Sequence, residues 1–101
     1  SVPRDVAGGG PLTLLSPRPN PTSHDARVLM AVSHAGAARV TVLDAMGRRV
    51  RTLYDGPLGV GRHAFEWDGT DADGRPRQSG IYWICAEQGP DRRAQKLVLM
   101  R

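Results

Sequence analysis

Three aspartates gather in one glycine-rich stretch, where their carboxylates could bind a hard metal cation. Asp68, Asp71 and Asp73 are separated by only one or two residues each. Calcium is held by several oxygen ligands on one flexible loop, so these residues are calcium candidates. The helix–loop–helix calcium motif is excluded, because Gly69 and Gly80 stand where it needs acidic ligands. A looser calcium site and a plain turn-forming role both stay open.

Catalytic chemistry has little support elsewhere. His24, His34 and His63 lie on separate segments without metal-ligand spacing. Cys85 is the single cysteine, which excludes a disulfide within this chain and a cysteine-based zinc site. It lies in an apolar run with no histidine motif nearby, which favours a small core residue over a nucleophile. A nucleophile elbow, a phosphate-binding loop and a carboxylate pair are also missing from the sequence. We therefore expect neither enzymatic activity nor a cofactor.

Positive charge is in excess but dispersed. The sequence has 14 Lys and Arg against 10 Asp and Glu, a net charge of +4. The arginines are scattered over the chain, without a basic helix or an exposed aromatic series. We expect a solvated basic surface and no nucleic-acid partner. No run approaches the roughly 20 apolar residues that span a bilayer, so we also expect no transmembrane segment.

Short apolar or alternating runs, separated by turns rich in glycine and proline, indicate strands throughout the chain. In one such run Val28, Met30 and Val32 fall on a single face, which is typical of a strand that is buried on one side. Seven runs of this kind predict an all-β fold, a seven-stranded antiparallel immunoglobulin-like β-sandwich. The expected strands are residues 12–15, 26–33, 38–45, 48–54, 62–67, 81–87 and 92–101.

A polar loop joins the fifth and sixth expected strands. Its Asp-Gly pairs at 68–69 and 73–74 favour positive φ. Trp67 and Tyr82 flank the loop, and each ring has a polar tip that needs a partner when it is buried. We expect the two rings to anchor this loop across one end of the sandwich. Trp83 lies beside Tyr82 in the most apolar run, and both are expected in the core.

Proline and glycine also mark the domain organisation. Residues 1–11, rich in glycine and proline, are interpreted as a flexible linker from an upstream region, with the Ig-like domain at 12–101. Pro19, Asn20 and Pro21 follow the first strand. Alternating prolines favour an extended segment, which we expect to bridge from one sheet to the other along an edge.

Several fragments, taken in order, resemble the type IX secretion system C-terminal sorting domain (type A). Residues 67–82 also resemble the Ig-like domain of the flagellar hook-capping protein. The fragments are Pro-Asn-Pro at 19–21, residues 40–50, Gly-Arg-His at 61–63, Trp-Asp-Gly at 67–69, Gly-Ile-Tyr at 80–82 and Lys-Leu-Val-Leu at 96–99. Positions expected to have a structural role within these fragments are Pro19, Asn20, Pro21, Gly47, Gly61, Trp67, Gly80 and Tyr82, the glycines at tight turns.

The resemblance implies a non-catalytic domain at the end of a larger secreted protein. Its partners would be the cargo domain in cis, the type IX translocon and a sortase-like peptidase at the outer membrane. The cargo would pass through the periplasm and the outer membrane, to be secreted or attached at the cell surface. Cleavage would fall in or before residues 8–11. The recognised end would consist of Lys96, Leu97, Val98, Leu99, Met100 and Arg101.

Two other functions stay open. A domain of the hook-cap kind would have a structural assembly role and stack against its own copies. An accessory module of a secreted enzyme would bind glycans, with Trp67, Tyr82 or Trp83 as the stacking platform. For the sorting function, one mode of recognition is pairing of the terminal strand's edge with a partner sheet.

Overall fold

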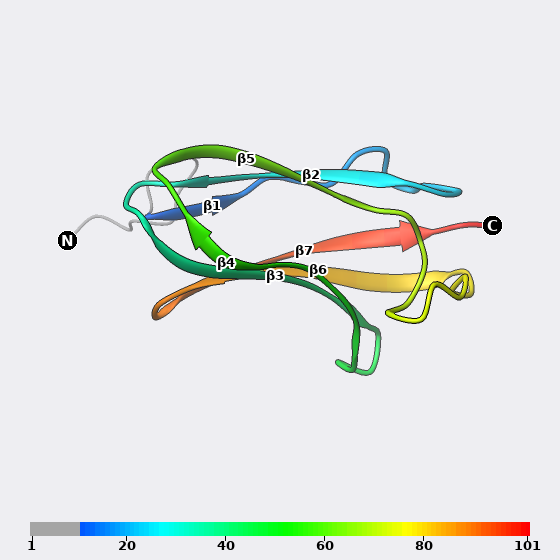
Figure 1. Cartoon of the computed structure of the whole chain (residues 1–101). Helices are drawn as coiled ribbons and strands as arrows, with labels where there is room; N and C mark the ends of the chain where they lie inside the picture. The colour runs from blue at the N-terminus through cyan, green and yellow to red at the C-terminus, as the bar shows by residue number, and fades with distance from the viewer. Residues whose placement is uncertain (1–10) are drawn as a thin grey trace.

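The computed structural model describes residues 11–101, which form seven β-strands (Figure 1). The expected linker lies outside the described residues, apart from Pro11. The strands are β1 (Leu12–Leu14), β2 (Ala26–Val32), β3 (Gly36–Asp44), β4 (Arg49–Leu58), β5 (Gly61–Trp67), β6 (Gly80–Gln88) and β7 (Asp91–Leu99). Within residues 11–101 there is no helix, and hence none with the length and apolar character needed to cross a membrane.

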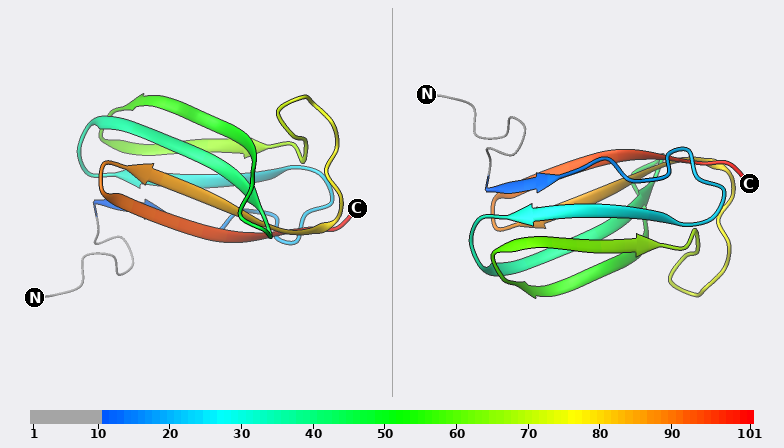
Figure 2. Two further views of the ribbon diagram at one scale, coloured as in Figure 1. Left: turned by 90° about the horizontal axis from the view of Figure 1, so that it is seen from below. Right: turned by 90° about the horizontal axis from the view of Figure 1, so that it is seen from above.

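The strands form two antiparallel sheets that pack face to face. One sheet has the order β1-β2-β5, and the other has the order β4-β3-β6-β7. Figure 1 shows them as an upper and a lower layer, and Figure 2 shows each layer from its outer side. The chain changes layer at the β2–β3, β4–β5 and β5–β6 connections. The predicted fold, a seven-stranded antiparallel immunoglobulin-like β-sandwich, is confirmed.

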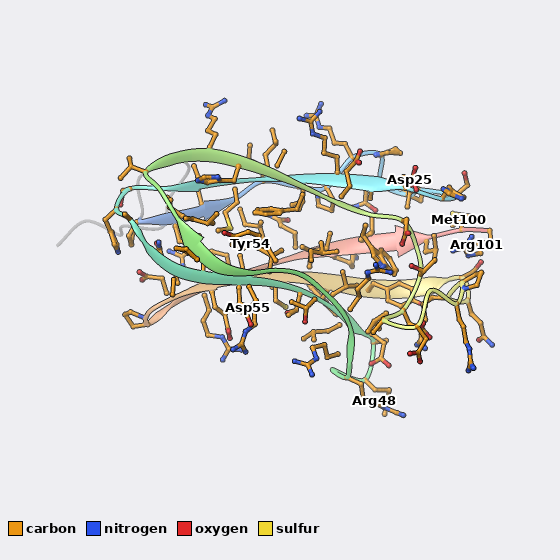
Figure 3. All side chains as sticks on the ribbon, in the orientation of Figure 1. Asp25, Arg48, Tyr54, Asp55, Met100 and Arg101 are labelled. Atoms are coloured by element: carbon orange, nitrogen blue, oxygen red, sulfur yellow. The ribbon has the colours of Figure 1, made fainter. Side chains whose placement is uncertain are left out.

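The core lies between the layers and consists of alternate residues of the strands. Side chains of a strand alternate between its two faces, so each long run contributes every second residue. Val28 and Met30 of β2 are buried in this way, and so is Ile84 of β6. At one side of the core, the ring of Tyr54 (labelled in Figure 3) packs against Phe65 with 5.4 Å between ring centroids.

Strand β4 is longer than expected. The expected strand ends at Tyr54, whereas β4 continues through Pro57 to Leu58. Because β4 is an edge strand of the four-stranded sheet, Pro57 breaks no ladder on its outer side, and such positions tolerate proline.

The expectation that Trp83 belongs to the core is wrong. Its side chain lies on the outer face of the four-stranded sheet and is 38% exposed. Tyr82 is buried as expected. β6 pairs on both sides, with β3 and with β7, but only one of its faces is covered by the second sheet. An apolar run therefore places half of its residues outside.

Candidate functional site

The expected recognition segment, residues 96–101, comprises the end of β7 and the two residues after it. Leu97 and Leu99 point inward and are completely buried. Lys96 is exposed on the opposite face, and Val98 is half-buried. Met100 and Arg101 extend beyond the strand (Figure 3). A partner that binds the folded domain can therefore contact Lys96, Val98, Met100 and Arg101, but not the buried Leu97 and Leu99.

The edge of β7 is covered along this segment by residues 19–22. The Asn20 side chain donates from Nδ2 to the Lys96 carbonyl oxygen at 2.8 Å and accepts at Oδ1 from the Val98 amide at 2.9 Å. Next along the chain, the Thr22 amide donates to the Val98 carbonyl (2.9 Å), and the Met100 amide donates to the Thr22 carbonyl (2.8 Å). These outward backbone groups are thus occupied, which contradicts edge pairing of this half of the terminal strand in the folded domain.

The same contacts give the Pro-Asn-Pro fragment its structural role. Arg18 bridges to Arg27 of β2 in one sheet, and Thr22 bridges in parallel to Leu99 of β7 in the other. Residues 18–22 thus contact both sheets at one edge, although the chain does not change sheet here, because β1 and β2 belong to the same sheet. The peptide bonds before Pro19 and Pro21 are both cis.

Arg101 connects the end of the chain to the loop at residues 68–79. Its Nε donates to the Arg77 carbonyl oxygen at 2.7 Å, and its Nη2 donates to the Gly69 carbonyl oxygen at 2.8 Å. The Arg101 backbone amide donates to Ser79 Oγ at 2.8 Å. Figure 1 shows the loop and the C-terminus at the same end of the sandwich. The candidate site therefore joins residues that are far apart in the sequence.

The loop is held by the two rings that flank it, as expected. Trp67 Nε1 donates to the Thr70 carbonyl (2.7 Å), and the Tyr82 hydroxyl donates to the Gln78 carbonyl (2.7 Å). Both rings are buried, with 5.0 Å between their centroids. Arg51 of β4 adds a third anchor, because its Nη1 donates to Thr70 Oγ1 at 2.6 Å and to the Asp71 carbonyl at 2.9 Å.

Two of the calcium candidates shape the turns of this loop. Asp68 Oδ1 accepts from Thr70 Oγ1 and from the Thr70 amide, and Asp71 Oδ1 accepts from the Asp73 and Arg75 amides. The hydrogen bond from the Thr70 hydroxyl is the largest cause of the lowered pKa of Asp68. The hydrogen bond from the Arg75 backbone amide is the largest cause of the lowered pKa of Asp71. In the described part of the chain, no three acidic, histidine or cysteine side chains come together as a metal site.

The remaining candidate side chains lie apart from one another. His24 contacts Asp25 through Nδ1 at 2.7 Å, His34 lies near Ser33, and His63 bonds the Gly59 carbonyl. Cys85 is half-buried in β6, and burial raises the pKa of its thiol. A thiol with a raised pKa is a poor nucleophile.

The turn glycines differ in their backbone. Gly47 and Gly61 have φ of 83° and 127°, a backbone region that favours glycine. Gly80 has no positive φ; it is the first residue of β6, and a turn there does not require glycine.

Of the proposed glycan platforms, Trp67 and Tyr82 are buried and cannot stack on a sugar, which leaves Trp83 alone.

The fold and the site define an Ig-like β-sandwich in which the terminal strand β7, residues 19–22 and the loop at residues 68–79 are joined by hydrogen bonds. The sequence model of the FlgD Ig-like domain family matches residues 22–91, and the chain belongs to this family.

Relatives and solved structures agree with this assignment. The chain is 44% identical over 51 residues to the basal-body rod modification protein FlgD of Salmonella typhimurium and 39% identical over 51 residues to that of Escherichia coli K12. Each match covers 50% of this chain and 22% of the relative, so the match spans about a fifth of those proteins.

Among solved structures, FlgD of Xanthomonas campestris superposes with a TM-score of 0.60 and 30% identity, over 86% of this chain and 64% of that one. Dimeric latent PorU of Porphyromonas gingivalis superposes with a TM-score of 0.66 and 19% identity, over 94% of this chain and 10% of that one. The PorU match shows a shared fold.

The sequence indicates the loop and its two aromatic anchors, but it does not indicate Arg51 as a further anchor or the contact of Arg101 with the loop. Arg51 and Arg101 both bond carbonyl oxygens of the loop. Neither carries a local signal, because an arginine on an edge strand or at a chain end looks like any other basic residue.

Proposed function

We propose that this chain is a non-catalytic sorting domain, which directs an attached cargo protein across the outer membrane by the type IX secretion system and to attachment at the cell surface. Under this proposal the translocon and its sortase-like peptidase read residues 96–101, with the cargo joined in cis. The domain supplies a folded terminal segment and no reacting group. Its location is then the cell surface or the medium.

The observation that supports the proposal is the way in which residues 96–101 are fixed. Asn20 and Thr22 hold the edge of β7, and Arg101 is bonded to the loop. The segment therefore presents a defined set of exposed side chains rather than a loose tail. The FlgD Ig-like model ends at residue 91, where β7 begins, so this segment lies beyond the matched residues.

A structural assembly role is the second candidate, and the family assignment favours it. The structure of FlgD from X. campestris is described in terms of hook capping, which is essential for flagellar assembly. A domain with this role would stack against its own copies. The two functions thus differ in whether the purified domain associates with itself and whether it moves a cargo.

A secretion assay tests the sorting proposal. A fluorescent protein with a signal peptide is fused to residues 1–101 in a bacterium that has the type IX apparatus. Deleting residues 96–101 is a poor variant, because it removes the buried Leu97 and Leu99 and unfolds the core. The double variant Lys96→Thr/Met100→Thr instead changes two exposed side chains of the segment and keeps the bonds of Arg101 to the loop. The matched control is Arg92→Ser, another exposed basic residue of β7.

We expect the parent fusion and the Arg92→Ser control to reach the medium or the cell surface, and the double variant to stay in the periplasm. Near-ultraviolet circular dichroism of the purified domains verifies that all three are folded. Export of the double variant at the parental rate would remove residues 96 and 100 from the signal. Retention of the folded parent together with self-association in sedimentation would instead favour the assembly role.

A further inference from the structure

The outer face of the three-stranded sheet has an apolar middle with arginines at both ends. Along this face, Leu29 of β2 lies opposite Ala64 of β5. On its other side the Leu15 amide donates to the Leu29 carbonyl at 2.9 Å. Leu15 is 46% exposed and Leu29 is half-buried. Leucine and alanine therefore form an open apolar strip across the middle of the sheet.

Arginines lie on both sides of this strip. Arg18 and Arg27 are bridged to each other at one end, and with Leu15 and Leu29 they line a shallow hollow. At the other end Arg62 is opposite Ala31, and Arg62 and Arg93 line a second hollow. The two hollows share Leu15 and Leu29 and so form one continuous surface. In Figure 3, side chains ending in nitrogen project from the outer side of this layer.

The arginines of this surface are among those that have no carboxylate partner within residues 11–101. Within residues 11–101, Arg39, Arg51, Arg77 and Arg92 each have a carboxylate oxygen within 4.0 Å. In the same part of the chain, none of the four arginines of this surface makes such an ion pair. Glu66 lies across the strand pair from Arg27, and the exposed Asp25, two residues before Arg27, lines a neighbouring hollow with Glu66. The surface therefore has a local excess of positive charge beside exposed leucines.

The spacing of the arginines defines a ligand. Arg27 and Ala31 are four residues apart on β2, which at a rise of about 3.3 Å per residue is about 13 Å. Arg62 lies level with Ala31. In an extended peptide, residues i and i+4 point to the same side at the same spacing of about 13 Å, and residue i+2 lies between them. An acidic residue at position i would meet Arg27, and a second acidic residue at i+4 would meet Arg62. An aliphatic residue at i+2 would lie on Leu15 and Leu29.

We propose that this face binds an extended acidic segment of a partner protein, with the pattern acidic–x–aliphatic–x–acidic. The guanidinium groups pair with the two carboxylates, and the leucine strip takes up the aliphatic side chain. A second copy of this chain is a poor occupant, because it would bring arginines against arginines. The proposed surface consists of β1, β2 and β5 with the adjoining Arg93 of β7, and none of residues 96–101 lines it, so its test is separate from that of the sorting function.

The probe is a fluorescein-labelled peptide of sequence Gly-Ser-Glu-Thr-Leu-Thr-Glu-Ser-Gly, titrated with the whole chain and followed by fluorescence anisotropy. We expect saturable binding, and we expect Arg27→Ser and Arg62→Ser each to weaken it about tenfold, since each removes one charge-assisted contact. The matched control is Arg49→Ser, an exposed arginine of the other sheet, which should leave the Kd unchanged. Replacing both glutamates of the peptide by glutamine, or its leucine by serine, should abolish binding.

Three outcomes would overturn the proposal. The first is a failure of the folded parent chain to bind the peptide. The second is an equal loss with Arg49→Ser, which would mean that net charge alone attracts the peptide. The third is Arg27-dependent binding to phosphatidylglycerol vesicles without binding to the peptide, which would assign the surface to anionic lipid. Circular dichroism verifies that each variant keeps its β structure.

Discussion

Asn20 and Val98 are 78 residues apart in the sequence, yet the Asn20 side chain replaces a neighbouring strand for the backbone at Val98. Its Oδ1 accepts from the Val98 amide while its Nδ2 donates to the Lys96 carbonyl, as a paired strand would do. A side chain placed in this way protects the edge of a sheet against further pairing. Asn20 is therefore both a connection between the sheets and an edge cap.

Replacing Asn20 by alanine should destabilise the domain by about 1–2 kcal/mol, because two hydrogen bonds are lost and each contributes about 1 kcal/mol net. Urea unfolding followed by tryptophan fluorescence measures the change. Asn20→Asp is the informative companion, since it keeps the acceptor for Val98 but sets an anion against the Lys96 carbonyl. It should be at least as damaging as alanine. Equal stability of all three proteins would show that these bonds contribute nothing.

Gly69 and Gly47 form a matched pair for backbone strain. Both have positive φ, 80° and 83°, which costs a residue with a Cβ about 1–2 kcal/mol. A Cβ at Gly47 meets nothing within 4 Å, whereas at Gly69 it would lie 3.0 Å from the His24 carbonyl oxygen and 2.5 Å from Arg101 Nη2. Gly69→Ala should therefore destabilise by at least about 1 kcal/mol more than Gly47→Ala in thermal or urea unfolding. Equal effects would mean that the loop shifts freely.

Stability should fall in acid because the pKa values of three carboxyls are lowered by folding. The main cause in each case is a hydrogen bond to the carboxylate: from the Arg48 backbone amide at Asp44, from the Thr70 hydroxyl at Asp68 and from the Arg75 backbone amide at Asp71. In the unfolded chain the pKa is near 3.8, so the ionised forms stabilise the fold fully above that value. This contribution is lost as the pH falls through 3.8 and through the lower folded pKa values. Urea midpoints between pH 7 and pH 3 measure the decline.

The double variant Asp68→Asn/Asp71→Asn tests the cause of this decline. It should be less stable than the parent at pH 7 and should lose less stability on acidification. Asp73→Asn is the control, since Asp73 is exposed in the same loop and no hydrogen bond to its carboxylate occurs within residues 11–101. An identical pH profile for the double variant and the parent would exclude the two loop carboxyls as a cause.

Substitution should cost much more stability at Trp67 than at Trp83. Trp67→Phe removes the bond to the Thr70 carbonyl and leaves a gap in the core, and it should cost about 2–3 kcal/mol. Trp83→Thr keeps a residue suited to a strand on an open face and should cost about 1 kcal/mol or less. Isothermal unfolding of both variants gives the comparison. A larger cost at Trp83 would indicate that its ring is packed in a way that the outer face does not provide.

Local chemistry in the sequence was sufficient for much of this fold. Alternation in runs such as Val28, Met30 and Val32 identifies strands and their inner faces, because a strand has a period of two. The Asp-Gly turns and the positive φ at Gly69 and Gly74 follow from the small size of glycine. The anchoring of the loop by Trp67 and Tyr82 follows from the need of buried polar tips for a partner.

The tertiary structure decided which faces of the strands are covered and which distant segments come into contact, and alternation in the sequence does not specify either. Trp83 lies outside because β6 has one covered face, and an apolar run does not say which faces of a sheet meet a second layer. β4 reaches Leu58 because its edge position tolerates Pro57. The candidate site joins Asn20, Val98 and Arg101 with the loop through hydrogen bonds between distant segments. Such contacts depend on which strands become neighbours, and that is fixed by the packing of the two sheets rather than by any local pattern.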